Sequence, residues 1–89
     1  MKYKQEFLND YNTKKGKERV KAFIKLVERR EKEFDKEIDD LTINELQEFI
    51  NPIKSRTFII DNIKLMPIDT YSLIRSYLDI ASETRINNI

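Results

Sequence analysis

The chain has 89 residues, with 17 Lys and Arg, 16 Asp and Glu, and a formal net charge of +1. It contains no Cys and no His, which excludes disulfides, thiol nucleophiles, imidazole bases and the usual zinc ligand sets. A chain of this length forms one small domain with little core to spare for a deep substrate cavity, so a binding module is favoured over an enzyme.

The first half of the chain predicts a short helix followed by a long one. Tyr3, Phe7 and Tyr11 recur at helical spacing, and we interpret residues 1–13 as a helical N-terminal extension. Asn12–Thr13 interrupts this pattern and supplies a cap for the next helix. That helix is expected to run from Lys14 to Phe34.

The long helix has two opposite faces. One is apolar and is expected to enter the core: Val20, Phe23, Ile24, Val27 and Phe34. The other is basic and is expected to face solvent: Lys14, Lys17, Lys21, Lys25, Arg29 and Lys32. Charge is uneven along the sequence, because residues 1–34 carry +5, residues 35–53 carry −5 and residues 54–89 carry +1.

The acidic middle of the chain predicts a solvated connector and a short capped helix. Asp35–Leu41 lacks the alternating oxygen ligands and the Gly of a calcium loop, so no metal is expected there. Thr42 and Glu45 have the spacing of a capping box. The helix that follows is expected to end at Asn51-Pro52, because the residue before Pro disfavours helical geometry.

The last third predicts two further helices. Residues 54–66 contain a strand-like Thr-Phe-Ile-Ile run, but no partner strand is evident, and we expect a short helix capped by Ser55. Pro67 ends it. A final helix, capped by Asp69 or Thr70, is expected to reach Thr84, and residues 85–89 are interpreted as a linker. Its predicted core face comprises Tyr71, Ile74, Tyr77, Leu78 and Ala81.

These elements predict an all-α fold, a bundle of four to five helices over residues 1–89, and their order resembles a known family. The phrases EIDDLTINELQEFI and YSLIRSYLDIASE, with the tail TRINNI, are similar to the N-terminal core-binding domain of phage integrases, the tyrosine recombinases. The resemblance implies a SAM-like fold. Residues 53–69 form a longer link than that family usually has, which puts the register of residues 54–56 in doubt.

The resemblance also implies a function in DNA integration and recombination. The family's catalytic arginines and tyrosine lie on a downstream domain, so none is assigned here and this chain is not expected to be an enzyme. The implied partners are double-stranded DNA, a C-terminal catalytic domain and other recombinase protomers on the DNA. No membrane partner, metal or cofactor is expected, and a cytoplasmic location is the default because no apolar run could span a membrane.

Seven residues are candidates for DNA contact, and each has a simpler alternative. Cations on the long helix can track phosphates or merely form a solvated face. Residues 54–57 can bind phosphate at a helix N-terminus or simply cap it. Arg75 can pair with guanine or form an ion pair with Asp79. The candidates are Lys14, Lys21, Lys25, Lys54, Ser55, Arg56 and Arg75.

Two other functions remain open. One is a helical protein-interaction module of a phage or mobile element, in which the segments of opposite charge pair between chains. The other is a helix-turn-helix regulator, which usually needs a short turn containing Gly, whereas the only Gly is Gly16.

Overall fold

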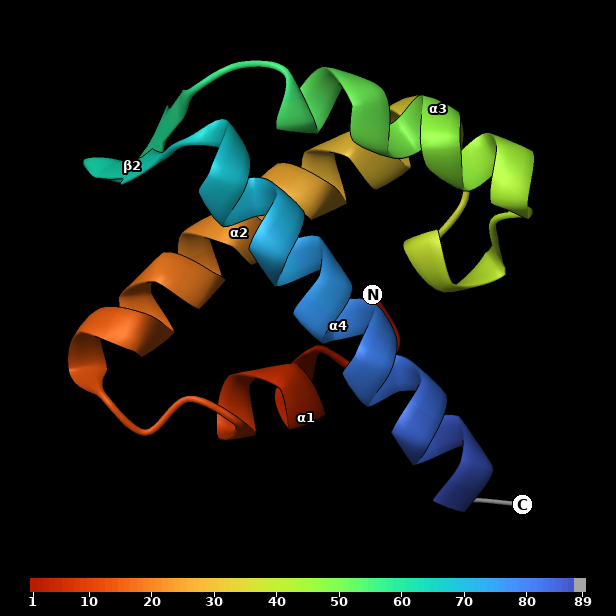
Figure 1. The fold of residues 1–89 in the computed structure, drawn as a ribbon, viewed down its shortest axis with the longest axis horizontal. Helices are drawn as coiled ribbons and strands as arrows, with labels where there is room; N and C mark the ends of the chain where they lie inside the picture. The colour runs from red at the N-terminus through yellow and green to blue at the C-terminus, as the bar shows by residue number, and fades with distance from the viewer. Residues whose placement is uncertain (88–89) are drawn as a thin grey trace.

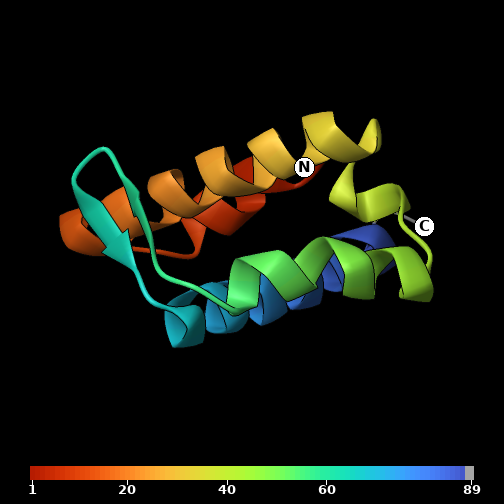
Figure 2. The same ribbon diagram turned by 90° about the horizontal axis from the view of Figure 1, so that it is seen from above.

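A computed structural model describes residues 1–87 as four α-helices, a 3-10 turn and a two-stranded sheet (Figure 1). The fold is mostly helical, but the hairpin means that the prediction of an all-α bundle was only partly right. Figure 2 shows two layers, with α1 and α2 in one and α3 and α4 in the other, and the hairpin at one end. The elements are α1 (Lys4–Asn9), α2 (Lys14–Phe34), the 3-10 turn (Ile38–Asp40), α3 (Ile43–Lys54), β1 (Phe58–Ile60), β2 (Ile63–Leu65) and α4 (Pro67–Asn87).

The long helix α2 has the predicted bounds, because local signals fix both of its ends. Thr13 accepts a hydrogen bond from the Gly16 amide at 3.0 Å, which satisfies one of the free donors of the first turn. A Cβ on Gly16 would lie 2.9 Å from the Thr13 hydroxyl oxygen, so the glycine leaves room for this cap. The helix ends at Phe34, and the capping residue that follows, Asp35, adopts the left-handed conformation with φ 55°.

The core lies between the two layers and includes the N-terminal segment. Phe7 is fully buried and packs edge-to-face against Phe23 and Tyr77, with ring centroids 6.0 and 5.5 Å apart. Residues 1–13 therefore contribute to the same core as the rest of the chain. Of the predicted face of α2, Val20, Phe23, Ile24 and Val27 are buried, while Phe34 is half-buried.

Helix α3 begins at its predicted cap but continues past its predicted end. Both hydrogen bonds of the Thr42–Glu45 capping box form. The helix was expected to end at Pro52, yet it runs to Lys54. Pro52 has no N–H for the Glu48 carbonyl, and Arg30 of α2 donates to that carbonyl at 3.1 Å instead. A side chain from a distant helix thus replaces the hydrogen bond that proline removes.

The helix expected over residues 54–66 is wrong, because this segment forms an antiparallel hairpin. Ile60 pairs with Ile63 across a two-residue turn, Asp61-Asn62, in which both residues have positive φ, 52° and 67°. Such turns match the twist of antiparallel strands, and Asn and Asp adopt them readily. Ile60 and Leu65 are buried against the core. The hairpin contacts α2, which supplies the partner surface that two short strands need.

Helix α4 is longer than predicted, and its buried face is rotated. It begins at Pro67, with the Asp69 carboxylate accepting the Met66 N–H at 2.9 Å. It continues through Asn87, so residues 85–87 are helical, while the rest of the predicted linker, residues 88–89, lies outside the described residues. Tyr71, expected in the core, is 47% exposed. The buried residues are Thr70, Leu73, Ile74, Tyr77 and Ala81.

Candidate nucleic-acid interface

The basic face of α2 is fully presented to solvent, as predicted. We call Lys14, Lys17, Lys21, Lys25, Arg29 and Lys32 the α2 basic stripe, and all six side chains are exposed. From Lys14 to Lys32 the stripe is about 27 Å long, at 1.5 Å per residue. This is comparable to roughly eight base pairs of duplex at 3.4 Å each.

Acidic neighbours of the stripe are partly neutralised by cations outside it. Glu28 binds the Lys4 ammonium at 3.3 Å, and Glu33 binds Arg30 at 2.6 Å. Lys25 is the exception within the stripe, because it forms an ion pair with Asp61 at the tip of the hairpin. Throughout the described part of the chain, the other five members of the stripe form no ion pair.

The packing brings Arg56 beside the stripe. A cleft of about 200 Å³ lies between α2, the end of α3 and β1, and both Arg29 and Arg56 line it together with Arg30 and Phe58. The Arg56 guanidinium lies over the Phe58 ring, 4.9 Å from its centroid. Three arginines and one carboxylate, Glu33, therefore surround this opening. Arg29 belongs both to the cleft and to the stripe, so the two form one surface.

The structure corrects the reason for choosing residues 54–56. The predicted anion site required a helix N-terminus at Ser55, but Ser55 follows the C-terminus of α3, and its hydroxyl donates to the Pro52 carbonyl at 3.1 Å. Carbonyl groups give this helix end a partial negative charge, which attracts cations and repels phosphate. Lys54 and Ser55 are exposed there. Of the three candidates, only Arg56 lines the cleft with α2.

Arg75 lies on a different surface. Its exposed side chain lines a shallow hollow of about 330 Å³ on the outer face of α4, together with Ile68, Tyr71, Ser72, Ser76 and Asp79. The predicted ion pair between Arg75 and Asp79 is not formed in residues 1–87. The structure therefore places Lys14, Lys21 and Lys25 on one face of α2, puts Arg56 in the cleft that Arg29 also lines, and leaves Arg75 on a separate surface.

Arg30 was not among the predicted contacts, and Arg29 was predicted only as a member of the basic face of the long helix, although both line the cleft. The spacing of Arg29, four residues after Lys25, already indicated the exposed face of α2. Arg30 has a structural role that no local pattern shows. It donates to the carbonyls of Glu48 and Phe49 and lies over the Phe34 ring at 4.8 Å.

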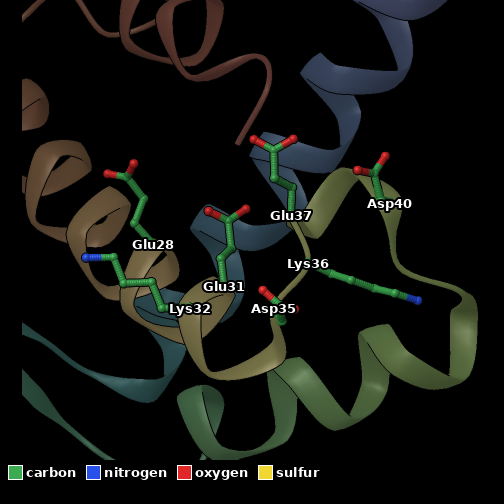
Figure 3. Close-up of a pocket in the computed structure, with 7 residues that line it drawn as sticks. All are labelled: Glu28, Glu31, Lys32, Asp35, Lys36, Glu37 and Asp40. Atoms are coloured by element: carbon green, nitrogen blue, oxygen red, sulfur yellow. The ribbon is translucent and has the colours of Figure 1, made fainter.

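The acidic connector forms a second charged surface, with a hollow of about 510 Å³ (Figure 3). It is less solvated than predicted, because the Asp39 side chain is only 1% exposed. The Met1 ammonium binds Glu31 at 2.8 Å and lies 3.4 Å from Glu37 and 3.9 Å from Asp39. These carboxylates are therefore occupied by a cation of the chain itself.

The same cluster shifts two pKa values. Burial lowers the pKa of the Met1 ammonium, but the hydrogen bond to Glu31 and the charges of Glu31, Glu37 and Asp39 outweigh burial and raise the pKa overall. Burial, and then the hydrogen bond to Asp39, raise the pKa of the Tyr77 hydroxyl. Tyr77 donates to Asp39 at 2.6 Å and accepts from the Tyr3 amide at 3.2 Å.

Residues 1–87 contain no group of three or more acidic side chains arranged to hold a metal ion. Nor does any helix in this range combine the length and apolar character needed to cross a membrane. Comparisons of the chain with protein-family models, curated proteins and solved structures find no match.

Proposed function

We propose that this domain binds double-stranded DNA through the α2 basic stripe and Arg56, as the core-binding module of a tyrosine recombinase. In this proposal it clamps a recombination site in the cytoplasm, while a catalytic domain elsewhere in the protein supplies the chemistry. The integrase-like order of sequence features and the predominance of helices support the SAM-like assignment. The hairpin between α3 and α4 occupies the long link in which the chain departs from the family pattern.

The observation that carries the DNA proposal is the continuity of the cationic surface. Arg29 joins the stripe to the cleft that contains Arg56, so cations from α2 and from the segment before β1 face the same side. A row of exposed cations about 27 Å long suits a phosphate backbone, which carries one charge per about 1.7 Å of duplex. Releasing counterions from that backbone favours binding without requiring a deep pocket.

Fluorescence anisotropy with a labelled duplex, measured at several salt concentrations, tests this proposal. We expect weak binding at low salt that falls steeply as salt increases. Each phosphate contact contributes about 0.9 to the slope of log K against log salt. Affinity that is independent of salt, or no binding at low salt, would refute the DNA proposal.

Paired variants locate the contact surface. The double variant Lys21→Gln/Arg29→Gln removes two cations from the stripe, so the salt slope should fall by about 1.8, at ~0.9 per contact. Arg85→Gln is the matched control, because Arg85 is an exposed cation near the end of α4. Because the double variant removes two charges and Arg85→Gln removes one, an equal loss per removed charge would show that net charge, and not the α2 surface, governs binding.

The proposal that this domain belongs to a tyrosine recombinase has a separate test. Reading the gene beyond Ile89 should reveal a region of roughly 150–200 residues, an ordinary domain length, that contains the arginines and tyrosine of the integrase family. A gene without such a region would refute the recombinase assignment and leave DNA binding to be judged by the salt titration.

The alternative of charge pairing between chains loses support from one observation. The acidic segment is partly neutralised within the chain, where Lys2 binds Asp40 at 2.8 Å and Lys36 binds Glu45 at 2.9 Å, beside the Met1 cluster. Few of its carboxylates are left for the basic segment of another copy.

A further inference from the structure

Helix α4 carries a second regular stripe on the face opposite the core. Its members recur at intervals of four and three residues, the spacing of the seam in a coiled coil. Both isoleucines are largely exposed, Ile68 at 75% and Ile86 at 69%, and the four polar residues between them are exposed too. We call this set the α4 outer stripe: Ile68, Ser72, Arg75, Asp79, Ser82 and Ile86.

The α4 outer stripe is symmetric about Tyr77. Ile68 lies nine residues before Tyr77, and Ile86 lies nine residues after it. Ser72 and Ser82 are each five residues away, on opposite sides. Arg75 and Asp79 are each two residues away and carry opposite charges. When a second copy of α4 runs in the opposite direction, isoleucine therefore faces isoleucine and serine faces serine. At the centre, the cation of one copy faces the anion of the other.

We propose that α4 binds α4 of a second copy of this chain, antiparallel, with a twofold axis near the level of Tyr77. In this arrangement each Arg75 meets Asp79 of the other copy, which forms two equivalent ion pairs. Ser72 faces Ser82, and Ile68 faces Ile86 at both ends. A twofold interface uses the same patch on both subunits, which is the self-complementarity that this stripe has.

Physical chemistry favours a second copy over an unrelated partner. An isolated Arg75 or Asp79 could serve many partners, whereas an antiparallel copy satisfies both charges and both isoleucines at once. Serine is small, so Ser72 and Ser82 leave room for the two helix backbones to approach on either side of the central charged pair. The isoleucines lie about 27 Å apart along the helix, which spreads apolar contacts to both ends of the seam.

The arrangement is accessible in the fold. The neighbours of α4 are α1, α2 and α3, and these cover the side formed by Leu73, Ile74, Tyr77 and Ala81. In Figure 1, α4 crosses in front of α2, and its C-terminal half runs beyond the other helices. The α2 basic stripe belongs to the other layer (Figure 2), so this inference does not depend on the DNA proposal.

Disulfide cross-linking tests both partner and direction, because the chain has no Cys of its own. An equimolar mixture of Ser72→Cys and Ser82→Cys chains should form a mixed disulfide dimer under mild oxidation. Each single variant alone should form at least tenfold less dimer, since its two cysteines would lie about 15 Å apart along the seam, beyond disulfide reach. Efficient dimers of Ser72→Cys alone would refute the antiparallel order.

Charge reversal tests the centre of the seam without cross-linking. By sedimentation equilibrium, Arg75→Asp and Asp79→Arg should each raise the dissociation constant of the dimer at least tenfold. The double variant restores opposite charges across the axis and should bring the constant back to within about threefold of the starting chain. Circular dichroism checks that every variant remains folded.

Two outcomes would overturn the proposal: a monomer at millimolar concentration, or single reversals that leave self-association unchanged. The Lys21→Gln/Arg29→Gln variant should dimerise like the starting chain, so loss of DNA binding and loss of dimerisation are separable results.

Discussion

Replacing Tyr77 with Phe removes one hydroxyl from the interior and disconnects three segments of the chain. The hydroxyl donates to Asp39 at 2.6 Å and accepts from the Tyr3 amide at 3.2 Å, while the ring itself is fully buried. The aromatic ring of Phe occupies the same space. The variant therefore isolates the polar contribution from the packing contribution.

The magnitude follows from the environment of Asp39. Its side chain is 1% exposed, so loss of the Tyr77 donor leaves a buried carboxylate with only the Lys2 amide, at 2.8 Å, and the Met1 ammonium, at 3.9 Å. Hydrogen bonds to charged groups contribute about 1.5–3 kcal/mol, and the Tyr3 amide adds about 1 kcal/mol. We expect a loss of about 3 kcal/mol.

This loss is large for a chain of this size. Domains are stable by about 0.05–0.15 kcal/mol per residue, or roughly 4–13 kcal/mol here. Urea unfolding should show a lower midpoint with an unchanged m value. The melting temperature should fall by roughly 12–24 °C, at about 4–8 °C per kcal/mol.

Tyr71→Phe is the matched control, because Tyr71 is on the same helix, is 47% exposed and forms no side-chain hydrogen bond within residues 1–87. It should change stability by less than about 0.5 kcal/mol. Asp39→Asn completes a double-mutant cycle, and the combined loss with Tyr77→Phe should be smaller than the sum of the single losses. A Tyr77→Phe variant as stable as the Tyr71→Phe control would refute the reasoning.

Three further predictions follow from the fold. Arg30→Lys should lower the free energy of unfolding in urea by about 1.5–3 kcal/mol, because an ammonium cannot donate to both carbonyls of α3 and also stack on a ring. A loss of stability no larger than that of Arg29→Lys would contradict this role of Arg30. Asn62→Val should cost about 1–2 kcal/mol at its positive φ, whereas Asn62→Gly should be neutral or stabilising; equal effects would argue against the turn. The raised pKa of the Met1 ammonium means that its stabilising contribution is complete below its unfolded pKa, about 8, and is lost as pH rises through the higher folded pKa, so thermal stability should decline above about pH 8. N-terminal acetylation should lower stability at pH 7 and flatten that decline, and an equally steep decline after acetylation would assign it to other groups.

Local signals in the sequence determined several elements without reference to the rest of the molecule. The cap at Thr13, the two-faced periodicity to Phe34 and the Thr42–Glu45 capping box depend on residues within one or two turns of each other. The exposure of the α2 basic stripe follows from the same periodicity. These features were predicted correctly because their causes lie next to them in the chain.

Only the tertiary structure decided the features whose causes lie far away in the sequence. The hairpin needs α2 as a packing surface. Its local signs were the strand-like Thr-Phe-Ile-Ile run and the Asp61-Asn62 turn between two apolar runs. Helix α3 passes Pro52 because Arg30 binds the freed carbonyl. Periodicity gave the pitch of α4 but not its rotation, which the packing of α1, α2 and α3 sets.

The same division applies to the candidate interface. The sequence shows which cations lie on one helix, since helical geometry fixes their spacing. It does not show that Arg56 meets Arg29 across a cleft, or that Arg75 lies on a separate face, because those relations depend on how helices pack. The spacing of residues within one helix or strand is a local property of the backbone. Which residues of different helices and strands lie close together is decided only when the core forms.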